Sequence, residues 1–170
     1  MTAVVMALFM GTALAAPRAM TVDDAVIAGI APGSALSYVR SIYGEPDGEK
    51  TKRTGNYPTH LVDYYGEGFV ITYDIFGGAQ NPLIQSIEST NAALVMPSGI
   101  HVGMKIAEVQ QIFSDIQEPF RRDEKNNQYT SPRFYVEVSD EKKGIRTVVF
   151  DVDKKGVIQK IFIYDRYGID

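Results

Sequence analysis

The sequence of 170 residues contains no cysteine, no tryptophan and only two histidines, His60 and His101. Without cysteine, the chain has no disulfide bond, thiolate metal site, iron–sulfur cluster, cysteine nucleophile or lipid anchor on an N-terminal cysteine. The formal net charge of −4 is unfavourable for a general nucleic-acid binder, so we expect no nucleic-acid partner. With 45% hydrophobic and 22% charged residues, the composition is that of an ordinary globular protein.

Motifs of common catalytic sites are also missing. The sequence has no G-x-S-x-G nucleophile elbow, no phosphate-binding G-x-x-x-x-G-K-[ST] loop and no dinucleotide-binding fingerprint. Residues from Asp151 to Gly156 resemble the start of a calcium loop, but Lys155 and Phe162 occupy positions that need oxygen ligands. We expect a hairpin turn there instead.

The remaining titratable residues do not form a recognisable site. His60 and His101 each stand alone in the sequence, so we expect neither a metal ion nor a cofactor. The adjacent acids Asp23-Asp24 and Asp123-Glu124 lie in no apolar stretch that would raise a pKa, and we expect solvated surface charges. These observations predict no catalytic residue and a protein that is not an enzyme.

The N-terminus has the features of a targeting segment. Residues 2–16 are uncharged and mostly apolar, a run too short for a membrane-spanning helix, which needs about 20 residues. Ala13-Leu14-Ala15 has the form that signal peptidase recognises, although no Lys or Arg precedes the apolar run. We predict a signal peptide over residues 1–16, a secreted or periplasmic protein, and no stable membrane insertion after cleavage. The alternative is a buried N-terminal helix.

The rest of the chain repeats itself. After a shift of about 70 positions, Gly33 aligns with Gly103, Val39 with Val109, and Ile42 with Ile112. Further along, Tyr73-Asp74-Ile75 aligns with Phe150-Asp151-Val152 after additional small shifts. Insertions in loops explain these shifts, because loops tolerate changes in length. We predict two tandem repeats, over residues 17–98 and 99–170.

Each repeat combines a helix with an antiparallel meander. Apolar residues at helical spacing predict helices around Val39 and Val109, the first with Ser34 as its N-cap and Gly44 at its end. Alternating residues then predict strands over 61–65, 69–75, 83–89, 133–138, 146–152 and 157–167, and polar residues predict loops over 45–58 and 118–131. The predicted class is α+β, with a helical segment packed on an antiparallel sheet in each repeat.

The two helical segments carry a family resemblance. Residues 29–46 (GIAPGSALSYVRSIYGEP) and 99–119 (GIHVGMKIAEVQQIFSDIQEP) resemble the repeated motif of SmpA/OmlA (BamE-like) domains and of the β-lactamase inhibitor protein (BLIP)-like family. The shared pattern is a glycine turn, a helix with a central valine, and Gly-x-Pro, which the first copy retains as Gly44-Glu45-Pro46. The resemblance implies an exported binding module without a catalytic centre. The absence of cysteine separates this chain from lipid-anchored and disulfide-bearing relatives.

Strand alternation divides the aromatic residues between the core and an uncovered sheet face. Phe150, Ile161 and Ile163 are expected in the core, and Val149 on the opposite side. In the strand over 61–65, Asp63 and Tyr65 are expected on the uncovered side as well. Aromatic residues and arginine on an uncovered sheet are typical of protein interfaces. The predicted partner-binding residues are Tyr65, Tyr135, Val149, Phe162, Tyr164, Arg133, Lys160 and Arg166.

These residues predict binding to another envelope or secreted protein. The alternative for the face itself is that loops or the other repeat cover it, or that its residues form ordinary cross-strand pairs. The alternatives for function are a structural envelope protein that self-associates, including a homodimer, and a binder of small molecules or cell-wall components.

Overall fold

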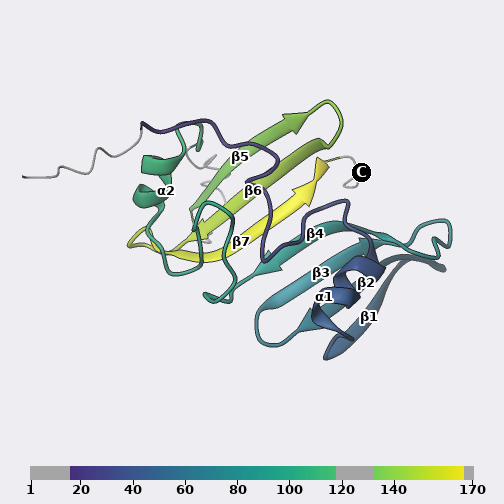
Figure 1. Cartoon of the computed structure of the whole chain (residues 1–170). Helices are drawn as coiled ribbons and strands as arrows, with labels where there is room; N and C mark the ends of the chain where they lie inside the picture. The colour runs from purple at the N-terminus through teal and green to yellow at the C-terminus, as the bar shows by residue number, and fades with distance from the viewer. Residues whose placement is uncertain (1–15, 118–131, 167–170) are drawn as a thin grey trace, which may run out of the picture.

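The computed structural model describes residues 16–117 and 132–166, which form an α+β fold (Figure 1). Within these ranges, seven strands build one antiparallel sheet in the order β1-β2-β3-β4-β7-β6-β5, accompanied by two helices. The elements are α1 (Leu36–Tyr43), β1 (Gly48–Thr54), β2 (Tyr57–Tyr65), β3 (Phe69–Asp74), β4 (Leu83–Ser89), α2 (Ile106–Ile112), β5 (Arg133–Asp140), β6 (Gly144–Val152) and β7 (Ile158–Asp165). The predicted α+β class and the antiparallel pairing are confirmed.

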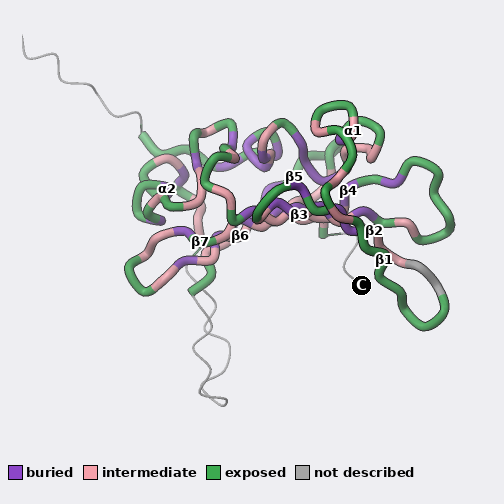
Figure 2. The backbone as a smooth tube through the Cα atoms, turned by 90° about the horizontal axis from the view of Figure 1, so that it is seen from below, coloured by how far each residue is buried: buried purple, intermediate pink, exposed green. Residues whose placement is uncertain are grey.

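The core lies on one side of the sheet. Figure 2 shows the sheet nearly edge-on, with both helices and the long connecting segments gathered on one side. Val39 of α1 and Val109 of α2 are fully buried against this side. We call the opposite side, on which the described residues place no helix, the open face. The buried sheet residues of the core include Ile71, Tyr73, Ile87, Val148, Phe150, Ile161 and Ile163.

Both helices occur where the sequence predicts them, but the first begins differently. The N-cap of α1 is Ala35, which makes no side-chain capping hydrogen bond, so the predicted capping role of Ser34 is wrong. Gly33 and Ser34 are instead tied to β4, because the Gly33 amide donates to the Ile84 carbonyl and the Ile84 amide donates to the Ser34 carbonyl, each at 2.8 Å. The Ser34 hydroxyl instead accepts a hydrogen bond from the Ala31 amide at 3.3 Å.

The end of α1 agrees with the sequence. Gly44 follows the last helical residue with φ of 77°, a left-handed conformation that favours glycine. Its amide bonds to the Arg40 carbonyl at 2.9 Å. The prediction that Gly44 ends the helix is therefore confirmed.

The strands also match the predicted segments, with one omission. Residues 45–58 were expected to form a loop, but they contain β1 and the start of β2. The reason is that β1, with sequence GEKTKRT, is an edge strand whose residues after Gly48 are all exposed, so it has no apolar alternation. The other predicted loop, residues 118–131, lies outside the described residues.

The pairing of β4 with β7 joins the two halves of the sheet. Its register places Ser86 opposite Tyr164 and Ser89 opposite Ile161. The three strands before β4 form one meander, and β5, β6 and β7 form another. A single open face therefore extends over strands from both halves of the chain.

The segment that precedes α1 connects both helices. The Arg18 amide donates to the Ile112 carbonyl at 3.1 Å, and the Ser114 amide donates to the Arg18 carbonyl at 2.9 Å. Further along, Ile27 and Ile30 are buried in the core, and the Ala28 carbonyl between them accepts a hydrogen bond from the Tyr43 hydroxyl of α1 at 2.5 Å. Residues 17–30 thus contact both halves. None of the helices in the described residues is long and apolar enough to cross a membrane.

Asp24 in this segment is not the surface charge expected from the sequence. Only 5% of the residue is exposed, and its carboxylate accepts hydrogen bonds from Arg18 at 2.6 and 2.7 Å. The Arg18 hydrogen bond, assisted by Thr21 and opposed by burial, lowers the Asp24 pKa to about 2. Its neighbour Asp23 is exposed and pairs with Lys143, while the second acidic pair lies outside the described residues.

Candidate functional site

Seven of the eight predicted partner-binding residues lie together on the open face. They line a groove of about 840 Å³ over strands β4, β7, β6 and β5. We call it the open-face groove. The predicted residues that line it are Arg133, Tyr135, Val149, Lys160, Phe162, Tyr164 and Arg166.

The eighth residue, Tyr65, is not on the open face, and that placement was wrong. Tyr65 is buried on the helix side, where its ring lies 5.5 Å from that of Tyr43 and 6.2 Å from that of Phe69. Its hydroxyl donates to the Gly44 carbonyl at 3.3 Å. The faces of β2 are the reverse of the prediction, because the charged Asp63, expected in water, is completely buried. Tyr64, at 38% exposure, therefore takes the outward position.

The floor of the groove is an apolar row across adjacent strands. The register places Tyr135 opposite Val149, and Val149 opposite Phe162. The Phe162 and Tyr164 rings, two residues apart on β7, lie 5.1 Å apart in a tilted arrangement. The side chains of this row belong to partly buried residues, so they keep contact area for another molecule.

One end of the groove carries a chain of ion pairs. Asp151 contacts the Arg133 guanidinium at 2.8 Å and the Lys160 ammonium at 3.5 Å. Lys160 also reaches Glu88 on β4 at 3.3 Å. These pairs connect strands β5, β6, β7 and β4, and each of the two cations described at this end, Arg133 and Lys160, has an acidic partner.

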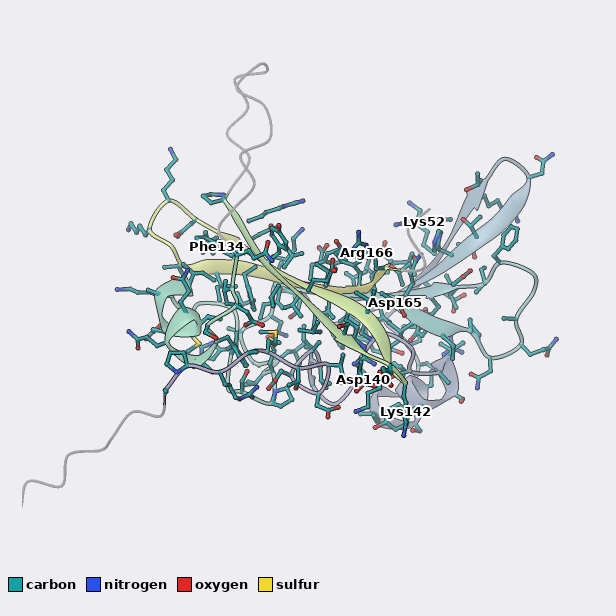
Figure 3. All side chains as sticks on the ribbon, turned by 90° about the horizontal axis from the view of Figure 1, so that it is seen from above. Lys52, Phe134, Asp140, Lys142, Asp165 and Arg166 are labelled. Atoms are coloured by element: carbon teal, nitrogen blue, oxygen red, sulfur yellow. The ribbon has the colours of Figure 1, made fainter. Side chains whose placement is uncertain are left out.

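The other end has one ion pair, between Arg166 and Glu137 at 2.7 Å. Figure 3 shows Arg166 on the side of the sheet away from the helices. The groove lining contains three acidic and three basic residues, so its formal charge sums to zero. The structure thus presents an apolar row between two sets of paired charges.

Four lining residues were not among the predicted binding residues, namely Glu88, Glu137, Thr147 and Asp151. Alternation along β5 and β6 places the last three on the same side as Tyr135 and Val149, so the sequence contained a signal for them. Glu88 comes from the first half, and only the register of β4 with β7 brings it opposite Phe162.

A second group of charges lies beneath α1, on the covered side of the sheet. The Asp63 carboxylate has no hydrogen-bond partner, and its nearest cation is Arg40 at 3.9 Å. Arg40 also pairs with Glu45 at 3.0 Å and Glu49 at 2.9 Å. Burial raises the pKa of Asp63 to about 6, Arg40 opposes this shift, and Glu49 and Glu45 add to it. The hydroxyl of Tyr73 is buried without a hydrogen-bond partner too.

A raised carboxyl pKa is a property of many catalytic acids, but Asp63 is fully buried and cannot touch a substrate. Among residues 16–117 and 132–166, no group of three His, Asp or Glu side chains could hold a metal ion. His60 contacts the Thr59 hydroxyl at 3.0 Å, and His101 contacts the Val102 carbonyl at 2.8 Å.

The segment that resembled a calcium loop is the expected hairpin turn. The Asp153 carboxylate accepts hydrogen bonds from the amides of Lys155 at 2.8 Å and Val157 at 2.9 Å. Gly156 has φ of 75°, which a glycine adopts without strain. The Asp153 carboxylate therefore holds the turn between β6 and β7.

Fold and groove together define an α+β protein with an aromatic, charge-balanced groove on one face of its antiparallel sheet. Comparison of the chain with protein families, curated proteins and solved structures finds no match.

Proposed function

We propose that this chain is an exported, non-enzymatic protein-binding module that holds another protein in the open-face groove. The observation that supports this proposal best is the apolar row of Tyr135, Val149 and Phe162 between paired charges. An apolar centre with a polar rim is the usual anatomy of a protein interface. Tyrosine and arginine are the residue types that contribute most often to binding energy there.

The charge balance of the groove favours one kind of occupant. Each cation in the groove already has an acidic neighbour within 4 Å, so a charged ligand would have to compete with these pairs. An uncharged surface loop of a partner protein, inserting apolar side chains over Phe162, buries the apolar row without that competition. We therefore propose such a loop as the occupant.

We further propose that the chain arose by tandem duplication, with repeats over residues 17–98 and 99–170. Matched hydrogen bonds support this proposal. The Gly33 amide donates to the Ile84 carbonyl at 2.8 Å, and the Gly103 amide donates to the Ile158 carbonyl at the same distance. The Leu36 amide donates to Pro82 and the Ile106 amide to Gly156, both at 2.9 Å. The start of α1 is thus attached to β4 in the same way as the start of α2 is attached to β7.

The similarity to BamE-like and BLIP-like repeats also remains a proposal, and it is consistent with a helix on an antiparallel meander in each half. Export rests on the apolar N-terminal segment, and we propose residues 1–16 as a signal peptide. Residues 1–15 lie outside the described residues. The chain from Arg18 onward already contributes to the fold, so cleavage after Ala16 preserves these contacts.

The test is affinity capture from an envelope fraction with the chain lacking residues 1–16, followed by binding of the purified candidate partner. Tyr135→Ala/Phe162→Ala removes the apolar row and should weaken binding at least about tenfold, as expected for loss of interface anchors. Tyr38→Ala is the matched control, because Tyr38 is 49% exposed on α1, away from the groove.

Equal binding by the wild type and the double variant would overturn the groove as the binding site. Light scattering of the purified chain measures its oligomeric state and so tests the self-association alternative. A concentration-dependent dimer that Phe162→Ala dissociates would replace the foreign partner with a second copy. A thermal-shift screen with cell-wall fragments tests the third alternative, because a ligand at about 100 times its Kd adds about 2.7 kcal/mol.

A further inference from the structure

Strand β1 is an open edge of the sheet. It is first in the strand order and pairs only with β2 among the described residues. All its residues after Gly48 are exposed. The strand at the opposite end, β5, differs, because Tyr135 exchanges backbone hydrogen bonds of 2.8 and 3.3 Å with Gln117. Backbone groups on the outer side of β1 are therefore available to an added strand.

The edge is strongly cationic, although the chain as a whole is acidic. Lys50, Lys52 and Arg53 lie within four consecutive positions, and their side chains form no ion pair in the described part of the chain. The one acid of β1, Glu49, is bound by Arg40 at 2.9 Å. This arrangement contrasts with the open-face groove, where every cation has an acidic partner.

Two of these cations point to the open face. Lys50 pairs with Val62, and Lys52 pairs with His60. On β2 these partners alternate with Asp63 and Tyr65, which lie on the helix side. Figure 3 shows Lys52 on the same side of the sheet as Arg166, away from the helices. An added strand beside β1 would place alternate side chains next to these lysines, since residues on one sheet face recur at every second position.

The charge of the edge decides which strand can add. A second β1 would bring lysines against lysines and arginine, and like charges on adjacent strands are destabilising. An extended segment with acidic residues at every second position would instead match both the open hydrogen-bonding edge and its uncompensated charge. We propose that β1 binds an extended acidic segment of a partner protein by strand addition. The proposal concerns a second surface and does not depend on the groove.

The experiment uses the ¹⁵N-labelled chain without residues 1–16 and a capped peptide of about eight residues that alternates glutamate and threonine, a usual strand length. We expect chemical-shift changes concentrated in residues 48–54 and slower exchange of alternate β1 amides with deuterium. A peptide alternating lysine and threonine is the charge control and should not bind. Raising NaCl from about 50 to about 500 mM should weaken binding by screening.

Lys50→Glu/Lys52→Glu should weaken binding of the acidic peptide about tenfold or more, because two attractive pairs become repulsive. Lys142→Glu/Lys155→Glu makes the same change in net charge on exposed hairpin turns and should bind as the wild type does. Shift changes elsewhere, equal binding of the lysine peptide, or no binding at millimolar peptide would overturn the proposal. Tyr135→Ala/Phe162→Ala should leave peptide binding intact, which separates this test from that of the groove.

Discussion

Replacing Asp63 with asparagine should stabilise the fold at neutral pH. The carboxylate is fully buried, has no hydrogen-bond partner, and lies 3.9 Å from the nearest guanidinium group. Burial raises its pKa from 3.8 to about 6 in the folded protein, although Arg40 opposes the shift. The folded state therefore holds the Asp63 proton more tightly than the unfolded state does. Stability should fall as pH rises from about 4 to about 6, and the loss persists above that range.

The size of the effect follows from the shift. Two pKa units correspond to at most about 3 kcal/mol of unfolding free energy near pH 7. Asparagine removes the charge but leaves an amide that also lacks an assured partner, which costs about 1 kcal/mol or more. We therefore expect Asp63→Asn to gain about 1–2 kcal/mol at pH 7 and to gain little near pH 4.

The measurement is urea unfolding followed by far-ultraviolet circular dichroism at both pH values. Glu67→Gln is the matched control, because Glu67 is exposed and the same change of charge should have little effect there. The reasoning would be refuted if Asp63→Asn were less stable than wild type near pH 7. It would also be refuted if the two proteins differed equally at both pH values, since the effect must follow the titration of the carboxyl.

Two further predictions concern positions where the backbone or a buried charge is constrained. Gly68→Ala should destabilise by about 1–3 kcal/mol, because Gly68 has φ of 77° and a Cβ there would collide with Oγ1 of Thr90. Urea unfolding measures the loss, and the additional change Thr90→Ala should recover part of it; no recovery would contradict the steric explanation. Arg18→Ala should lower Tm at neutral pH, because it leaves the buried Asp24 carboxylate without its cation. This difference should shrink as pH falls from about 4 through about 2, because Asp24 then becomes protonated in the folded as well as the unfolded state; a difference independent of pH would contradict this assignment.

Much of the sheet could be predicted because its strands have one buried and one exposed side. On β6, Val148 and Phe150 alternate with Thr147 and Val149, and this pattern identifies both the strand and its faces. The same reasoning brought most residues of the groove together, because lining residues on β5, β6 and β7 follow from alternation. A strand can be predicted from the sequence when one of its faces is buried, because its apolar residues then alternate with polar ones.

The errors have physical reasons of the same kind. Strand β1 was missed because no residue in it is buried, so its sequence carries no alternation. The faces of β2 were reversed because Asp63 was assigned to water, whereas in the fold it is enclosed between α1 and the sheet. Glu88 could be placed in the groove only through the pairing of β4 with β7, which no local pattern encodes.

The pairing of β4 with β7 also affects the order in which the chain folds. Within each meander, strands pair with neighbours in the sequence, but the second edge of β4 pairs with β7, which lies near the end of the chain. Pairings between distant segments form slowly, because closing a long loop costs chain entropy before the stabilising contacts form. During synthesis, the first half therefore exists with the β4 edge unpaired and the Arg18 segment without its contacts on α2. Pairing with β7 covers the β4 edge, and α2 supplies the contacts of the Arg18 segment. A chain shortened at its C-terminus should therefore aggregate through β4 rather than form a separate folded half.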